Sequence, residues 1–181
     1  MKGYHYIKRG IDIILSGMAI VILSPLLLFL CIAIKLDTPG PILFKQKRVG
    51  IHRSFFQIYK FRTMRIDTPK DVPTHMLENP EQYITKVGKF LRKTSLDELP
   101  QIFNIFKGEM SIVGPRPALW NQDDLVAERE KYGANDVTPG LTGWAQINGR
   151  DELEIPDKAR LDGEYVKHLG PWMDLKCFLG T

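Results

Sequence analysis

Residues Ile13–Ile34 read IILSGMAIVILSPLLLFLCIAI, an apolar run without a charged side chain. As a helix, a run of this length can cross a hydrocarbon core of about 30 Å. The rest of the 181-residue chain is mixed and polar, and the whole length suits about one domain. We therefore expect a membrane anchor over residues 1–36 and one folded domain over residues 37–181.

Ser24-Pro25 lies near the middle of the apolar run. Proline removes a backbone hydrogen bond and bends or breaks a helix. Basic residues flank both ends of the run, so the positive-inside rule chooses no orientation. From the residues alone, two topologies stay open. The helix either spans the membrane with a kink, or breaks, dips into the membrane and returns.

Composition narrows the classes of function. The chain carries 25 basic and 21 acidic residues, with basic clusters at residues 45–65 and 86–93. Such clusters suit anionic lipid, phosphate or nucleic acid about equally. Two cysteines give no disulfide framework and indicate a reducing compartment. The four histidines lack zinc-ligand spacing, and no P-loop, G-x-G-x-x-G or G-x-S-x-G motif occurs.

Periodicity predicts the remaining elements. Residues 42–48 and 55–61 read as two short strands joined around Gly50, which indicates a β-hairpin. Residues 65–81 hold three prolines without periodicity and predict a loop. Apolar spacing predicts helices at residues 84–93 and 99–110. Residues 121–132 read as a polar helix, residues 157–169 as the final helix, and residues 172–179 as an amphipathic tail. The expected fold class is α+β, predominantly helical, with a small β-hairpin and interfacial amphipathic helices beside the membrane helix.

Residues Thr94–Gln101 read TSLDELPQ and place two adjacent carboxylates, Asp97 and Glu98, before an apolar helix. Ser95-x-x-Glu98 is a capping box, which would only open that helix. Alternatively, a helix N-terminus keeps a carboxylate ionised and attracts phosphate, as a nucleophile that attacks phosphorus requires. Neighbours on a helix point about 100° apart, which favours one nucleophile plus one metal ligand or base. Pro100 predicts a kink or a displaced helix start.

Further cations are candidates for phosphate binding. Lys60 and Arg62 end the apolar face of the second predicted strand. Arg116 stands between two prolines, on a stiff loop suited to bidentate contact with phosphate or carboxylate. Arg150 closes a turn-rich stretch and is a candidate for ligand contact. The structural alternative for each is a solvated face or an incidental surface turn.

Five stretches resemble, in order, the motifs of the small monotopic phosphoglycosyl transferases, the bacterial sugar transferase family. They are KFRTM at 60–64, SLDELPQ at 95–101, VGPRP at 113–117, PGLTGWAQINGR at 139–150 and LDGEYV at 161–166. The resemblance implies transfer of a sugar 1-phosphate from a UDP-sugar to polyprenol (undecaprenyl) phosphate, with release of UMP. This is the first membrane step of glycan assembly, including capsule and exopolysaccharide. The resemblance also implies Mg2+ and a ping-pong route.

Residue roles follow from the same resemblance. Asp97 would attack the β-phosphate to give an aspartyl phospho-sugar, and Glu98 would assist as metal ligand or base, so that both carboxylates are candidate Mg2+ ligands. The residues that would contact the phosphates or the rest of the substrate are Lys60, Arg62, Arg92, Arg116, Arg150 and Asp162. Segments 66–69 and 118–122 look most like those of capsule-type enzymes that use N-acetylated deoxy-sugars. Family members usually continue past Thr181, so we expect a longer native chain.

The resemblance also implies a place in the cell. Ser24 and Pro25 would form the break of a re-entrant helix, so the dip is favoured over the span. The protein would then lie monotopically on the cytoplasmic face of the inner membrane. Its partners would be the UDP-sugar, polyprenol phosphate and inner-membrane lipids, without nucleic acid; a homodimer is left open. The competing hypothesis is a non-enzymatic, membrane-tethered basic module that binds nucleic acid or anionic partners, in which Asp97 has no role.

Overall fold

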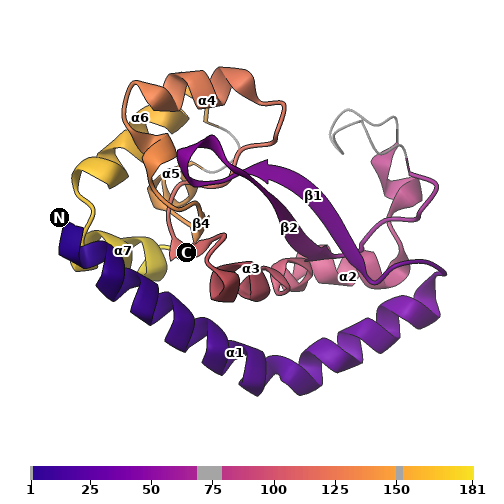
Figure 1. Cartoon of the computed structure of the whole chain (residues 1–181). Helices are drawn as coiled ribbons and strands as arrows, with labels where there is room; N and C mark the ends of the chain where they lie inside the picture. The colour runs from indigo at the N-terminus through magenta and orange to yellow at the C-terminus, as the bar shows by residue number, and fades with distance from the viewer. Residues whose placement is uncertain (1, 69–78, 150–152) are drawn as a thin grey trace.

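The computed structural model describes residues 2–68, 79–149 and 153–181. Figure 1 shows one long helix, α1, along one side of the molecule and the other elements gathered on its concave side. The helices are α1 (Lys2–Asp37), α2 (Lys86–Lys93), α3 (Gln101–Lys107), α4 (Asp123–Glu130), α5 (Trp144–Ile147), α6 (Ile155–Lys167) and α7 (Pro171–Leu179). The strands are β1 (Leu43–Val49), β2 (Phe55–Phe61), β3 (Ser111–Val113) and β4 (Gly140–Thr142). Short 3-10 helices are η1 (Ile51–Arg53), η3 (Pro80–Tyr83), η4 (Leu96–Glu98) and η5 (Ala134–Asp136).

This mixed, mainly helical architecture confirms the predicted hairpin and the predicted helices. The ends of those helices differ from the predicted ones by up to three residues. Most of the loop predicted at residues 65–81 lies outside the described residues.

The long helix continues through Pro25, where the residues left a kink or a break open and the family resemblance implied a break. Proline has no N–H to donate to the carbonyl of Val21, four residues earlier. The Ser24 hydroxyl donates to that carbonyl instead, at 2.8 Å. The helix therefore bends near its middle without ending (Figure 1).

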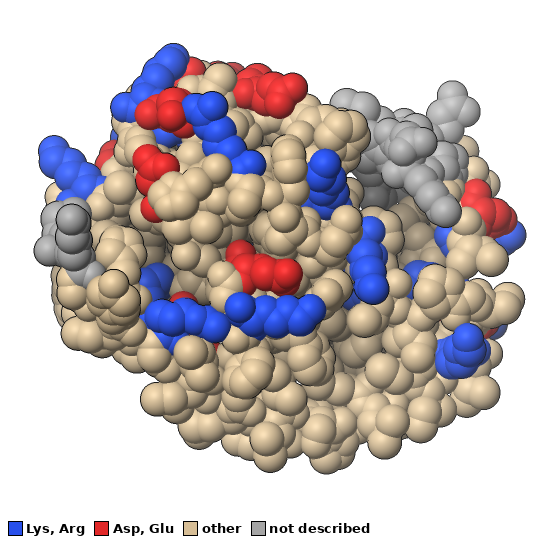
Figure 2. Space-filling view, viewed as in Figure 1, with Lys and Arg blue, Asp and Glu red and all other residues tan. Residues whose placement is uncertain are grey.

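The surface of α1 is largely apolar and uncovered. By length and composition alone, α1 could cross a membrane, and its most apolar window has a mean hydropathy of 2.7. Only 17% of that window is buried, and Val21, Ile22 and Phe29 are each at least 66% exposed. Figure 2 shows hardly any charged side chains on the lower surface, where α1 lies in Figure 1. An apolar surface of this extent indicates contact with a membrane or a partner.

Both ends of α1 are attached to the same folded body. Near its start, the Tyr4 hydroxyl and the Lys8 amine donate to the Asp174 carboxylate of α7, at 2.7 and 2.6 Å. At its end, the Asp37 carboxylate accepts the N–H of Val87 in α2 at 3.1 Å. Both ends of α1 therefore lie against the part of the chain that follows it, residues 38–181.

The β1–β2 hairpin is antiparallel and is fixed by α3 along its β2 edge. The Asn104 side chain of α3 accepts the Tyr59 N–H at 3.0 Å and donates to the Gln57 carbonyl at 2.8 Å. One apolar cluster joins α1, β2, α2 and α3; its buried members are Leu27, Leu30, Ile34, Phe61, Leu91 and Ile102. These contacts hold the end of β2, and with it Lys60, beside η4.

The parallel pair β3–β4, with Ser111 opposite Gly140, was not predicted. Three-residue strands are too short to show an alternating pattern. The pair places the VGPRP loop beside the PGLTG turn, because Gly114 N–H donates to the Thr142 carbonyl at 2.8 Å and Gly140 N–H to the Pro115 carbonyl at 2.9 Å. A Cβ on Gly114 would lie 2.5 Å from a backbone oxygen, so this close approach requires glycine.

Gly88→Ala is expected to destabilise the protein at the contact between α2 and the end of the hairpin. The new Cβ would lie 2.1 Å from the Thr63 carbonyl oxygen, so α2 must shift. Overpacking of this kind costs roughly 1–3 kcal/mol, which thermal unfolding in detergent would detect. Gly10→Ala in α1 is the matched control, since nothing lies within 4 Å of its new Cβ. Equal unfolding temperatures for the two variants would show that the close contact is not needed.

Candidate active site

Asp97 and Glu98 lie in η4, immediately before α3. Ser95 has a left-handed backbone, with φ of 56°, and its side chain makes no capping hydrogen bond. The Glu98 side chain turns toward two cations, so the capping-box interpretation is wrong. The displaced helix start is confirmed, because α3 begins at Gln101 after Pro100. A non-glycine residue at positive φ is uncommon and is found preferentially at functional sites.

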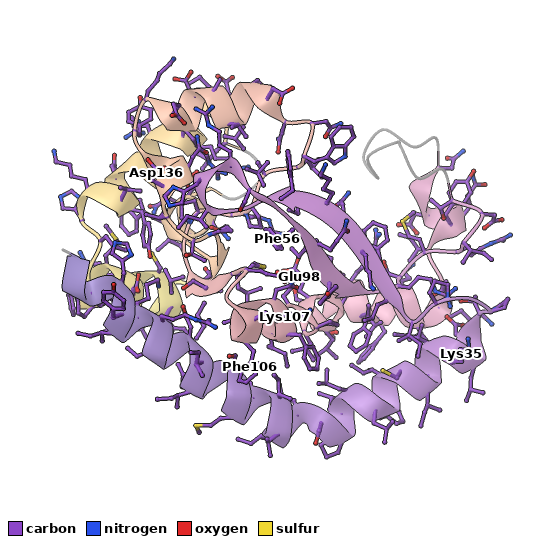
Figure 3. All side chains as sticks on the ribbon, viewed as in Figure 1. Lys35, Phe56, Glu98, Phe106, Lys107 and Asp136 are labelled. Carbon is purple, nitrogen blue, oxygen red and sulfur yellow. The ribbon has the colours of Figure 1, made fainter. Side chains whose placement is uncertain are left out.

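Three segments meet at the Glu98 carboxylate. Its Oε1 accepts from Lys60 Nζ at 2.7 Å and from Arg116 Nη2 at 3.0 Å. Figure 3 shows Glu98 between the β1–β2 hairpin and α3, with Phe106 on the side of α3 that faces α1. Burial raises the pKa of Glu98, but the charges of Arg116 and Lys60 outweigh this effect and lower it to about 2. Glu98 is therefore ionised at neutral pH and is a weak base.

The Asp97 carboxyl group has a different electrostatic environment from that of Glu98. Burial raises the pKa of Asp97, and the charge of Lys60 opposes that rise. Within the part of the chain that the structure describes, no ion pair and no hydrogen bond from another residue reaches the Asp97 carboxylate. Its carboxylate accepts a hydrogen bond from its own backbone N–H, whereas Glu98 Oε1 already accepts from two cations. Of the two carboxylates, Asp97 has the properties of a nucleophile.

Arg92 approaches the dyad from α2. Its Nε donates to the Thr63 hydroxyl at 2.8 Å, which orients the guanidinium. Burial lowers the pKa of Arg92, and the nearby Asp97 charge opposes that change. Lys60 and Arg92 thus act on Asp97, while Lys60 and Arg116 contact the neighbouring Glu98, so that three cations border the dyad. Such an arrangement can stabilise the negative charge of a diphosphate.

The donor groups suit one mode of magnesium binding. Among the described residues, no group of three or more His, Cys, Asp and Glu side chains is placed to hold a metal ion. Mg2+ is usually bound by one or two carboxylates together with substrate phosphates and water. The adjacent Asp97 and Glu98 fit that mode, and a cage made entirely of protein ligands is not present in the described ranges.

Arg62 does not face the dyad, which corrects the expectation that it contacts phosphate. Its guanidinium donates to the carbonyls of Thr38 and Pro39, at 2.7 and 2.5 Å, and the residue is only 6% exposed. The strand ends at Phe61, so the alternation that would place Arg62 beside Lys60 no longer applies. Arg62 instead holds the turn that follows α1.

Asp162 is fully buried in α6, which corrects the expectation of direct substrate contact. Its Oδ2 lies 2.6 Å from Nη2 of Arg129 in α4. Burial raises the pKa of Asp162, and the Arg129 charge opposes the rise. Arg129 was not predicted as a functional residue, because it stands on a polar helix without a motif around it. Arg150 lies outside the described residues.

Comparisons with known proteins show what this chain is similar to. A family model described as bacterial sugar transferase matches residues 3–181. The chain is 41% identical over 97% of its length to a UDP-glucose:undecaprenyl-phosphate glucose-1-phosphate transferase of Escherichia coli K12, and covers 39% of that relative. It is 39% identical over 98% of its length to a UDP-N-acetylgalactosamine-undecaprenyl-phosphate N-acetylgalactosaminephosphotransferase of Aeromonas hydrophila, and covers 43% of it.

A relative of similar size is also found. The uncharacterised sugar transferase EpsL of Bacillus subtilis is 39% identical over 97% of this chain, which covers 85% of that protein. By contrast, the chain spans about two fifths of the length of the Escherichia coli and Aeromonas relatives.

Proposed function

The chain belongs to the bacterial sugar transferase family, and from this we infer that it transfers a sugar 1-phosphate from a UDP-sugar to polyprenol phosphate, releasing UMP. The observation that carries this proposal is the Asp97 carboxylate, which has no ion-pair partner among the described residues and belongs to a dyad bordered by Lys60, Arg92 and Arg116. Relatives named as undecaprenyl-phosphate sugar phosphotransferases support it.

In the first step, an Asp97 oxygen attacks the β-phosphorus of the donor. A new oxygen–phosphorus bond forms, the bond from the β-phosphorus to the bridging oxygen breaks, and UMP leaves with that oxygen. The product is an aspartyl phospho-sugar. Lys60, Arg92 and Arg116 stabilise the charge that the diphosphate develops, and Glu98 keeps Lys60 and Arg116 oriented.

In the second step, a phosphate oxygen of the lipid attacks the same phosphorus and the Asp97 carboxylate leaves. The lipid then carries a diphosphate-linked sugar, and the free enzyme is restored. Covalent catalysis divides one difficult exchange into two easier ones. Since its pKa is about 2, Glu98 fits the role of metal ligand and orienting group better than the role of base.

We propose Mg2+ as the cofactor, held by Asp97 and Glu98 together with the donor diphosphate, where it would neutralise phosphate charge. For the donor we propose a UDP-linked, N-acetylated deoxy-sugar, as the sequence of segments 66–69 and 118–122 suggested. The names of the relatives supply competing sugars: glucose, galactose and N-acetylgalactosamine. A screen of these UDP-sugars decides among them.

We propose that residues 1–36 form a re-entrant anchor and that residues 37–181 form a catalytic domain on the cytoplasmic face of the inner membrane. The support is geometric, because Tyr4 and Lys8 at one end of α1 and Asp37 at the other all bind the domain that follows α1. If that domain stays outside the hydrocarbon, both ends of α1 stay on the same side of the membrane as the domain. The bend and its exposed apolar side chains then enter the membrane.

Cysteine labelling tests this topology. A cysteine introduced by Gly3→Cys, with Cys31 and Cys177 replaced by serine, should resist a membrane-impermeant maleimide in intact cells and react after the cells are opened. The re-entrant anchor predicts the same pattern for a cysteine introduced by Thr38→Cys. Labelling of one of the two positions from outside would establish a helix that spans the membrane.

The activity itself is tested with purified protein, UDP-sugars, polyprenol phosphate and Mg2+. We expect UMP release that requires the lipid for continued turnover. Absence of UMP release with every donor, combined with binding of nucleic acid, would instead support the basic-module hypothesis.

A further inference from the structure

The loop that carries Arg116 is fixed by its carbonyl groups. Pro115 and Pro117 have no N–H, so the loop offers few donors of its own. Four consecutive carbonyls, those of residues 115–118, each accept a hydrogen bond from another part of the chain. The donors are, in order, Gly140 N–H at 2.9 Å, the Arg129 guanidinium at 3.0 Å, the Arg48 guanidinium at 3.0 Å and Val49 N–H at 3.0 Å.

The donor to the Arg116 carbonyl is itself part of a buried ion pair. Arg129 is 5% exposed and Asp162 is fully buried. Nε and Nη2 of Arg129 both contact Asp162 Oδ2, at 2.8 and 2.6 Å, and Nη2 also donates to the Arg116 carbonyl. Asp162 on α6 therefore sets the direction of a guanidinium on α4, and that guanidinium fixes the backbone of Arg116.

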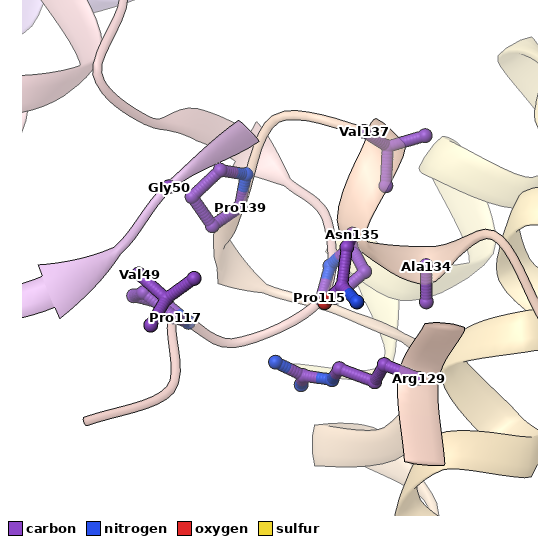
Figure 4. A pocket seen from close by; sticks show the side chains of 9 residues that line it. All are labelled: Val49, Gly50, Pro115, Pro117, Arg129, Ala134, Asn135, Val137 and Pro139. Carbon is purple, nitrogen blue, oxygen red and sulfur yellow. The ribbon is translucent and has the colours of Figure 1, made fainter. Parts of the chain in front are cut away.

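Arg129 has no room to act on a substrate directly. It lines a small cavity behind the loop together with Pro115, Pro117 and Asn135, and Figure 4 shows its side chain reaching from α4 toward the two prolines. The cavity measures about 10 Å3. This volume holds at most one water molecule and excludes a nucleotide or a sugar.

We propose that Arg129 and Asp162 are a positioning pair that acts through the Arg116 carbonyl and sets where the Arg116 guanidinium meets Glu98 and the donor diphosphate. That the ligand is a donor diphosphate rests on the proposed function. The contacts that lead from Asp162 through Arg129 to the Arg116 carbonyl do not depend on it. The Arg116 side chain makes a 3.0 Å contact with Glu98, so a shift of its backbone by about 1 Å would break it. Misplacement of that size can cost roughly 100-fold in rate.

The test removes the pair without leaving a buried charge. Replacing a buried ion pair by apolar residues of similar volume is often neutral or stabilising, whereas removing one partner is not. The variant is therefore Arg129→Met combined with Asp162→Leu. A second variant, Arg129→Lys, keeps a charge beside Asp162 but replaces the planar fork with one point donor. The control is Arg160→Met with Asp157→Leu, an exposed pair on α6 that does not touch the loop.

A double-mutant cycle with Arg116→Ala separates positioning from a general structural effect. With Arg116 present, we expect kcat/KM for UMP release to fall about 10- to 100-fold in the pair variant and in Arg129→Lys, while the control stays within about 2-fold. In the Arg116→Ala background, the same changes should cost less than about 2-fold. Equal losses in both backgrounds, or no loss in either, would overturn the proposal.

Hydrogen exchange tests the same inference without an activity assay. Amides in the peptide spanning residues 113–119 should exchange faster in the pair variant than in the wild type, while the unfolding temperature is unchanged or higher. Unchanged exchange in this peptide would overturn the positioning role. If the wild type releases no UMP from any donor, the proposed function fails, and the exchange experiment still decides whether the pair holds the loop.

Discussion

Asp97→Asn is expected to lower the rate of UMP release by at least about 10³-fold while the protein remains folded. Asparagine has nearly the same shape as aspartate, but its amide is not a nucleophile that can form an acyl phosphate. In the described structure no partner residue holds the Asp97 carboxylate, so the substitution breaks no ion pair. The measurement is UMP release under saturating donor and lipid, alongside thermal unfolding in detergent.

Asp123→Asn, at an exposed position in α4, is the matched control and should keep turnover within about 2-fold. Retention of full turnover by Asp97→Asn would assign the chemistry to another group. It would also remove the main distinction between a transferase that uses Asp97 as its nucleophile and a basic module that only binds anions.

Lys60→Met is expected to lower turnover by roughly 10²- to 10³-fold and to move the acid limb of the pH profile to higher pH. Lys60 contacts Glu98 at 2.7 Å, and its charge also opposes the burial that raises the pKa of Asp97. Asp97 attacks as a carboxylate, so turnover falls as the pH falls through its pKa. Without Lys60 that pKa rises further, and the loss of activity begins at higher pH.

The pH profile of kcat distinguishes the two carboxylates. Glu98, with its pKa lowered to about 2, titrates below Asp97, whose pKa burial raises. Lys60→Arg should restore part of the rate, because it returns the charge. Lys45→Met is the control, since Lys45 lies over the Tyr59 ring, 5.5 Å from its centroid, and does not contact the dyad. An acid limb that stays in place in Lys60→Met would show that Lys60 does not set the ionisation of Asp97.

Residues within short motifs were predictable from sequence, and residues that act through tertiary contacts were not. Lys60, Arg92 and Arg116 stand in or beside the matched stretches, and the structure places all three near Asp97 or Glu98. The capping box was wrong because a left-handed Ser95 turns the chain before α3 begins. No local sequence pattern predicts a left-handed backbone for this serine.

The remaining differences have a similar origin. Period-two alternation placed Arg62 beside Lys60, but the strand ends between them and Arg62 binds the turn after α1. The role of Arg129 depends on Asp162, which is thirty-three residues away in the chain. The hairpin, α2 and α3 were found because each carries its own periodic apolar face, whereas the β3–β4 pair depends on long-range hydrogen bonds between three-residue strands.

The central claim is that Asp97 carries the phospho-sugar between donor and lipid. Its most direct test is the intact mass of the protein after rapid mixing with UDP-sugar and Mg2+ in the absence of polyprenol phosphate. If Asp97 is the nucleophile, we expect a mass increase of one sugar phosphate, located on the peptide that contains Asp97, and its loss when the lipid is added. UMP formation only after lipid addition, with no adduct at any quench time, would contradict it and establish direct transfer between the two substrates.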